Sequence, residues 1–348
     1  MRILYGIQAT GNGHITRARV LAPALERAGV RVDYLFSGRG PDKYFNMEPF
    51  GDYQTRTGLT FSLQKGQVQW LKTFRDLQLR RYWRDVRQLD LSDYDLVLTD
   101  FEPVSAWAAR KQGVPSVGIA HQYAFLYPVP GHVRPKTMAQ MVKWFAPVDQ
   151  AVGLHWDHFE QPILPPMIQA PIYPATVEPN KILVYLAFDQ REALERMLQP
   201  FHDYQFYIYT DIKAPIDKGH LHFRPFSRDG FQRDLASCAG VICNAGFGLI
   251  SEAIQYGKKI LTRPLRGQVE QLSNARVLER LGLAVVMTES DAYLLEAWLE
   301  MLSPRAAAYP DVATVLADWI ADGARQPVAE LAQQLWQRDS ADVIIQPA

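Results

Sequence analysis

Short apolar strands alternate with helical segments along this chain, and the alternation constrains the fold more than any other feature. Runs typical of strands at Arg2–Ile7 and Val30–Phe36 flank a helical pattern at Ile15–Ala28, which makes a strand–helix–strand unit. A second unit comprises Tyr94–Thr99, Pro103–Gln112 and Ser116–Ala120. Strands joined through helices run parallel, so we predict a doubly wound α/β sheet in this half of the chain.

Prolines recur between Pro162 and Pro179 and favour an extended linker, because proline interrupts helices and central strands. The alternation then begins again at Ile182–Leu186, Arg191–Leu198, Tyr204–Tyr209, Leu235–Ser237 (a helix end), Gly240–Cys243, Leu249–Tyr256 and Lys259–Thr262. The 348 residues are enough to bury two cores. We therefore predict Rossmann-like domains over 1–165 and 181–325, a linker over 166–180, and a C-terminal helix and tail over 326–348 that packs back on the first domain.

Composition excludes several classes of protein. Lys plus Arg and Asp plus Glu each number 37, so no overall positive field favours nucleic acid. The sequence begins with a strand pattern rather than a secretory leader, and no apolar run is long enough to span a bilayer. Cys238 and Cys243 lie in an apolar stretch without metal-ligand spacing. These features predict a cytoplasmic protein without a bound metal.

A glycine-bearing loop, Gly11-Asn12-Gly13-His14, separates the first strand from the first helix. Such loops let the backbone approach a ligand, and helix N-termini favour anionic groups. A nicotinamide dinucleotide site would need a third glycine and a carboxylate closing the second strand, and both are missing here. His14 alone is as well explained by capping or packing.

Asp100 changes the interpretation of His14. It directly follows a predicted strand, so both residues should lie at the same edge of the parallel sheet. A carboxylate bonded to one imidazole nitrogen orients the ring and leaves the other nitrogen to accept a proton. We therefore predict that His14 is a general base and that Asp100 is its partner.

The stretch Cys243–Ala253 ends a strand and begins a helix near Leu249. The amides of Gly246 to Leu249 should point at a diphosphate, with the helix dipole adding attraction. Glu252, predicted on the first turn, can accept two hydrogen bonds from a ribose diol, or merely complement the dipole. Glu270 and Gln271 follow a second loop, where they can bind sugar hydroxyls or form a solvated helix start.

These motifs resemble those of the GT-B glycosyltransferases. Their donor-binding signature is similar to a series of motifs in this chain: Asn-Ala-Gly-x-Gly-x-x-x-Glu-Ala, then Tyr-Gly-Lys, Pro, Glu-Gln and Asn-Ala. The likeness is greatest to the UDP-glycosyltransferases and the peptidoglycan lipid I N-acetylglucosaminyltransferase (families 1 and 28). The Gly-x-Gly-His loop, Asp100 and Gly118–Gln122 also match. The resemblance covers nearly the whole chain and implies that an N-terminal acceptor domain and a C-terminal nucleotide-sugar domain face a cleft.

The resemblance implies roles for individual residues. Donor-binding residues would be Phe226 beside the nucleobase, Asn244, Gly246, Phe247 and Gly248 at the diphosphate, Glu252 at the ribose, and Gln268, Glu270 and Gln271 at the sugar. Acceptor-side residues would be Gly11, Gly13, His121, Gln122 and Tyr123. It further implies inversion of the anomeric centre without a metal or cofactor, the nucleotide sugar being a co-substrate. Leu186–Gln190 lacks the Gly/Ser-rich phosphate contact of many relatives, and Phe247 replaces small or tryptophan residues.

Two aromatic segments are candidates for acceptor contact. Residues 67–87 mix tryptophan, phenylalanine and tyrosine with lysine and arginine and are predicted to be helical. They can form a surface for anionic glycans or lipid headgroups, or an ordinary amphipathic helix on the sheet. The second segment contains Tyr123, Phe125, Tyr127 and His132, whose rings suit sugar faces.

The sequence therefore predicts an inverting glycosyltransferase that moves a sugar from a nucleotide-diphosphate donor, expected to be a UDP-sugar, to a hydroxyl of a glycan, a lipid-linked acceptor or a small molecule. Peripheral contact with the inner face of a membrane is a further expectation. Two alternatives stay open: a nucleotide-sugar epimerase of the same architecture, and a non-catalytic nucleotide-sugar-binding protein.

Overall fold

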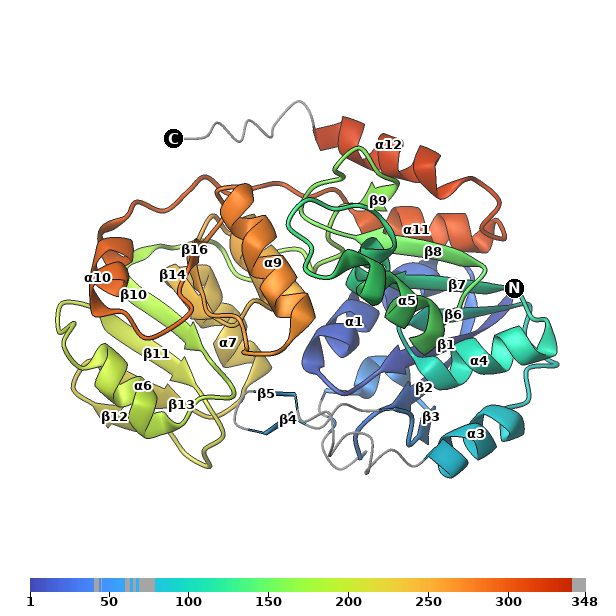
Figure 1. The fold of residues 1–348 in the computed structure, drawn as a ribbon, viewed down its shortest axis with the longest axis horizontal. Coiled ribbons are helices and arrows are strands. Elements are labelled where there is room, and N and C mark those ends of the chain that lie inside the picture. Colours follow the sequence, from blue (N-terminus) through green and yellow to red (C-terminus); the bar gives the residue numbers. More distant parts are fainter. Residues whose placement is uncertain (41–43, 45, 60–62, 65–66, 69–78, 340–348) are drawn as a thin grey trace.

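The computed structural model describes residues 1–40, 44, 46–59, 63–64, 67–68 and 79–339. Within them, two separate seven-stranded sheets lie side by side (Figure 1). The first has the order β3-β2-β1-β6-β7-β8-β9 and is parallel throughout. The second has the order β12-β13-β11-β10-β14-β15-β16 and is parallel except at β12–β13. The predicted fold of two parallel-sheet α/β domains is confirmed.

The strands of the first sheet are β1 (Arg2–Gln8), β2 (Arg31–Ser37), β3 (Tyr53–Arg56), β6 (Leu96–Asp100), β7 (Ser116–Ala120), β8 (Gln150–Leu154) and β9 (Ile163–Leu164). Those of the second are β10 (Glu178–Tyr185), β11 (Gln205–Tyr209), β12 (Ile216–Lys218), β13 (Leu221–Arg224), β14 (Cys238–Cys243), β15 (Lys259–Thr262) and β16 (Val285–Val286). A separate antiparallel pair joins β4 (Leu63–Gln64) to β5 (Gln67–Val68).

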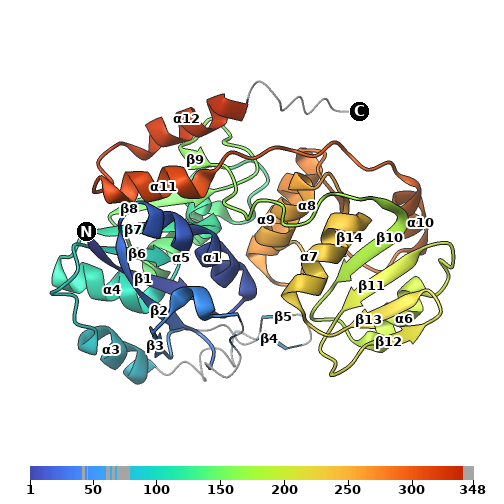
Figure 2. The ribbon, with the colours of Figure 1, turned by 180° about the vertical axis from the view of Figure 1, so that it is seen from behind.

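Alternate residues of β1 face opposite layers of helices. Ile3, Tyr5 and Ile7 pack with α1 (Asn12–Arg27) and α11 (Val312–Ala321). Leu4 packs with α3 (Leu79–Gln88), α4 (Pro103–Gln112) and α5 (Pro135–Phe145). The period of two thus buries both faces of the first sheet, as a parallel sheet requires, and the two layers lie on opposite sides in Figures 1 and 2.

The second sheet is also covered on both faces. Helices α6 (Arg191–Leu198) and α10 (Ala292–Glu300) share one core cluster with it, and α7 (Arg228–Ser237) and α8 (Phe247–Gln255) share another. Helix α9 (Val269–Arg280) follows β15 and lies beside the first domain (Figure 1). None of the described helices is long and apolar enough to cross a membrane.

Several predicted boundaries need correction. Helix α1 begins at Asn12 rather than Ile15, with Gly11 as its extended N-cap, so His14 lies in its first turn; glycine's low helix propensity hid this start. Asp100 is the last residue of β6 rather than the residue after the strand. Helix α8 begins at Phe247, which places Glu252 on its second turn.

Two segments contradict their predicted structure. Central strand β10 includes Pro179 within the predicted linker, and the pairing with β14 is irregular between Glu178 and Ile182, which accommodates a residue without an N–H. Gln67 and Val68 form strand β5 rather than helix, because they pair antiparallel with Gln64 and Leu63 of β4. Residues 79–87 of the segment are helical, and 69–78 lie outside the described residues.

The end of the chain returns to the first sheet. Helix α11 packs against α1, and α12 (Val328–Asp339) packs against β9. The indole Nε1 of Trp336 donates to the carbonyl of Ile163 at 2.7 Å, and both helices lie on the first domain in Figure 2. The domain boundaries given above remain predictions, to which we add the proposal that α11 also belongs with the first domain.

Candidate active site

The loops that follow β7 and β15 meet between the two domains. Nε2 of His121 lies 2.8 Å from Oδ1 of Asn274, and Nε2 of Gln122 donates to both oxygens of Glu270 at 3.2 and 3.3 Å. Strand carboxyl ends are where α/β sheets bind ligands. The two domains therefore bring their ligand-binding edges together.

His14 and Asp100 contact one another at this edge. Nδ1 of His14 lies 2.6 Å from Oδ1 of Asp100, whose side chain is fully buried, whereas the imidazole is 15% exposed. Two features fix the backbone turn that follows Asp100. Phe101 has φ of +54°, and the carboxylate of Glu102 caps α4 by accepting from the amides of Val104 and Ser105.

Arg17 is a third member of this cluster that the sequence interpretation missed. Its Nε donates to Oδ2 of Asp100 at 2.7 Å and its Nη2 to Oδ1 at 2.5 Å. Burial, the largest influence, opposes ionisation of Asp100, but Arg17 and His14 together outweigh it and lower the pKa of the carboxyl. The i,i+3 spacing of His14 and Arg17 on one helix was the signal that could have revealed this.

The geometry also favours one tautomer of His14. Nη2 of Arg17 lies 2.9 Å from Nδ1 of His14, but Nη2 is closer to Oδ1 of Asp100 and donates to it. A hydrogen on Nδ1 is needed to make the 2.6 Å contact with a carboxylate attractive, because two acceptors at that distance would repel. We assign the hydrogen to Nδ1, which leaves Nε2 free to accept a proton.

Four predicted glycines border open space. A Cβ atom built at Gly11, Gly13, Gly246 or Gly248 would meet no other atom within 4 Å. Gly246 is the extended N-cap of α8, so the first amides of that helix lack intrahelical acceptors. Helix α1, which carries His14, and helix α8, which begins after Gly246, come from different domains and pack against each other.

The residues predicted at the nucleotide lie on the second domain. Glu252 is 7% exposed and accepts from Nε2 of Gln232 at 2.8 Å. Burial raises the pKa of its carboxyl, although Gln232 and Arg228 act in the opposite direction. Phe226 is 52% exposed, with its ring edge-on to Tyr185. An exposed aromatic face and a nearly buried carboxylate suit a base and a ribose.

Other donor-side residues shape the loops. Nδ2 of Asn244 donates to the carbonyl of Arg263 at 2.9 Å, and Asp189 forms an ion pair with Arg263, so the loops after β10, β14 and β15 are held together. Oε1 of Gln271 accepts from the amide of Leu265, which occupies that oxygen. Oε1 of Gln268 is buried without a partner among the described residues. Buried acceptors are normally hydrogen-bonded, so this oxygen is available to a hydrogen-bond donor of a ligand.

The structure buries three of the predicted acceptor-side residues, His121, Gln122 and Tyr123. The ring of His121 stacks on Phe247 at 4.2 Å between centroids, so it joins the domains. Tyr123 donates to the carbonyl of Ala146, and Gly118 leaves room for its ring. In the same segment Phe125 is buried, while Tyr127 retains partial exposure. Tyr123 thus packs in the core of the first domain, and its role at the acceptor stays a prediction.

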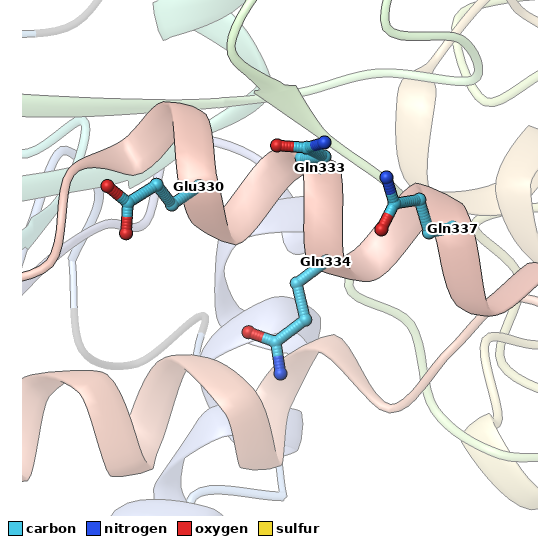
Figure 3. A pocket seen from close by; sticks show the side chains of 4 residues that line it. All are labelled: Glu330, Gln333, Gln334 and Gln337. Atoms are coloured by element: carbon cyan, nitrogen blue, oxygen red, sulfur yellow. The ribbon is translucent and has the colours of Figure 1, made fainter.

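A surface hollow of about 440 Å³ lies on α12, lined by Glu330, Gln333, Gln334 and Gln337 (Figure 3). It contains none of the predicted site residues, and its polar side chains point in different directions from one helix. Within the part of the chain that the structure describes, no group of three His, Cys, Asp or Glu side chains is arranged to hold a metal.

Residues 1–303 match Glycosyl transferase family 1. No curated protein matches the chain. Among solved structures the fold is similar to LpCGTa in complex with UDP (TM-score 0.61, 15% identity, 97% of this chain and 99% of that one) and to the spinosyn forosaminyltransferase SpnP (0.58, 14%, 98% and 99%). It is also similar to SsfS6 of Streptomyces sp. SF2575 complexed with thymidine diphosphate (0.53, 17%, 97% and 99%). These likenesses confirm the predicted GT-B fold.

Proposed function

This chain belongs to Glycosyl transferase family 1, and from that premise we propose that it transfers a sugar from a nucleoside-diphosphate donor, a UDP-sugar, to an acceptor hydroxyl with inversion and without a bound metal. The observation that carries the proposal is the contact of His14 with Asp100 and Arg17 on helix α1, which packs against α8 of the other domain. A base and an anion-binding helix end are the two parts that this transfer needs.

The proposed reaction is a single displacement. Nε2 of His14 accepts the proton of the acceptor hydroxyl while that oxygen bonds to the anomeric carbon. The bond from that carbon to the donor diphosphate breaks, and its electron pair leaves with the diphosphate. The first amides of α8, which begins at Phe247, would stabilise the departing charge. Attack opposite the leaving group inverts the anomeric centre.

A nucleotide screen tests the donor assignment. Calorimetric titration with UDP, GDP, dTDP, CMP and NAD should give selective binding of one nucleoside diphosphate. Two similar structures support this expectation, LpCGTa in complex with UDP and SsfS6 complexed with thymidine diphosphate. Binding of NAD alone, or of none of the five, would overturn the proposed donor site.

Glu252 is proposed to accept hydrogen bonds from the ribose hydroxyls. Glu252→Gln should weaken UDP binding by roughly tenfold or more, since hydrogen bonds to a charged group contribute about 1.5–3 kcal/mol. Calorimetry on the variant measures this loss. Glu296→Gln, an exposed change on α10, is the matched control.

The 2′-deoxy analogue of UDP separates a ribose contact from a general loss of the site. If Glu252 holds the 2′-hydroxyl, the substitution should cost less affinity for the deoxy analogue than for UDP. Equal losses for both nucleotides, or none for either, would refute the ribose assignment.

The remaining expectations concern acceptor and location. We propose a glycan, a lipid-linked acceptor or a small molecule as the acceptor. Product analysis distinguishes transfer from the alternatives, because an epimerase would release an altered nucleotide sugar without any acceptor, and a binding protein would release no product. Cys238 and Cys243 are free and buried, which supports the proposal of a reducing, cytoplasmic location.

A further inference from the structure

Positive charge is concentrated on one helical layer of the first domain. The exposed basic residues of α3, α4 and α5, with the residue preceding α5, are Arg80, Arg81, Arg84, Arg87, Arg110, Lys111, Arg134, Lys136 and Lys143. The three helices contain a single acidic residue, Asp85, which is 8% exposed. Because the whole chain balances 37 basic against 37 acidic residues, this layer departs strongly from the chain average.

Acidic residues in the loop between α3 and β6 have other partners. Asp95 accepts from the backbone amide of Arg2, and Asp93 lies 3.8 Å from the Arg2 guanidinium. Asp90 accepts from the amide of Ser92. Two of these carboxylates, those of Asp93 and Asp95, therefore lie at the start of β1.

Tryptophans lie among these basic residues, one on each helix. The rings of Trp83 and Trp107 are 5.4 Å apart, and Nε1 of Trp107 donates to the carbonyl of Trp144 at 3.0 Å. The Trp144 side chain is 54% exposed, and Leu79 is 46% exposed. The three helices share one core cluster on the same face of the sheet. Figure 1 shows them together on the first domain.

We propose that this layer, the basic–tryptophan face of α3, α4 and α5, docks on the surface of an anionic lipid bilayer. Tryptophan favours the boundary between headgroups and acyl chains, where its ring is buried and its N–H stays solvated. Basic side chains around it are attracted to anionic headgroups. A nucleic-acid duplex would use the charge, but its stacked bases would not cover exposed apolar groups such as Leu79 and Trp144.

The segment just before α5 contacts the second domain. The amide of Val133 donates to Oγ of Ser273 on α9 at 2.9 Å, and Gly131 packs against Val277. The docking inference goes beyond the proposed transfer reaction, and a binding assay tests it without any turnover.

Vesicle co-sedimentation tests the face directly. The full chain should bind vesicles that contain phosphatidylglycerol and should bind pure phosphatidylcholine vesicles far more weakly, with binding to the former falling as salt rises. The double variant Arg80→Gln, Arg84→Gln should lower the vesicle–water partition coefficient by about 25-fold, because each basic residue contributes a factor of roughly five. Trp144→Ala should lower it by about tenfold through lost apolar burial.

Matched controls keep the test independent of folding. Arg196→Gln with Lys213→Gln removes two exposed cations from the second domain and should leave vesicle binding within about twofold, since these residues lie outside the face. Thermal unfolding should be unchanged for both double variants. Equal binding to the two vesicle types, no binding to either, an equal loss in both double variants, or tighter binding of a DNA or RNA duplex than of vesicles would overturn the proposal.

Discussion

Replacement of His14 by alanine should lower turnover by about a thousandfold, the middle of the range that a general base contributes. Affinity for the nucleoside diphosphate should change by less than about twofold, because the imidazole contacts Asp100 and Arg17 rather than the residues proposed to hold the donor. Steady-state kinetics and calorimetry on the same preparation measure the two quantities. The role of His14 in proton transfer predicts this split between turnover and affinity.

His202→Ala serves as the matched control, since His202 is exposed on the second domain and its ring contacts His220. It should retain full turnover. If the His14 variant kept normal turnover, His14 would not be the base. A parallel loss of nucleotide affinity would instead mean that His14 supports the donor site.

Arg17→Met should destabilise the protein by about 3–5 kcal/mol at pH 7, the usual cost of leaving a buried charge without its partner. Asp100 is fully buried and would retain only its hydrogen bond with Nδ1 of His14. Methionine keeps most of the volume of the arginine stem. Urea unfolding at pH 7 measures the difference in the free energy of unfolding.

The direction in which the destabilisation by Arg17→Met changes with pH follows from the pKa of Asp100. In the native protein the lowered pKa of Asp100 stabilises the fold above the unfolded carboxyl pKa, and that contribution is lost as pH falls through the folded pKa. Without Arg17, burial dominates and raises the pKa, so ionised Asp100 destabilises the variant at pH 7. The gap in unfolding free energy between variant and wild type should therefore narrow as pH falls from the raised carboxyl pKa of the variant to the lowered one of the native protein, because the unfolded state is the same for both.

Arg17→Met combined with Asp100→Asn separates this effect from the loss of a buried arginine as such. The double variant leaves no buried carboxylate without its partner, so at pH 7 it should be destabilised less than Arg17→Met. Its difference from Arg17→Met should shrink as the pH falls. Equal, pH-independent losses in the single and double variants would contradict the ion-pair account.

The sequence predicted the sheets well because strand and helix periodicities are local properties. The contact of His14 with Asp100 could be anticipated because parallel strands direct the loops that follow them to one edge. The burial of Tyr123 could not, since it depends on the missing Cβ of Gly118 on a neighbouring strand. Pro179 in a central strand was equally hidden, because its unpaired position depends on the irregular pairing with β14.

The return of α11 and α12 to the first sheet makes the order of synthesis matter. Ile15 and Leu21 on α1 belong to the core cluster that includes Leu316 of α11, so the first domain to leave the ribosome lacks its last layer until the second has been made. Domains usually fold as they emerge, N-terminal first. Here an apolar face of α1 stays uncovered until the second domain has been synthesised, and the first domain is completed only afterwards.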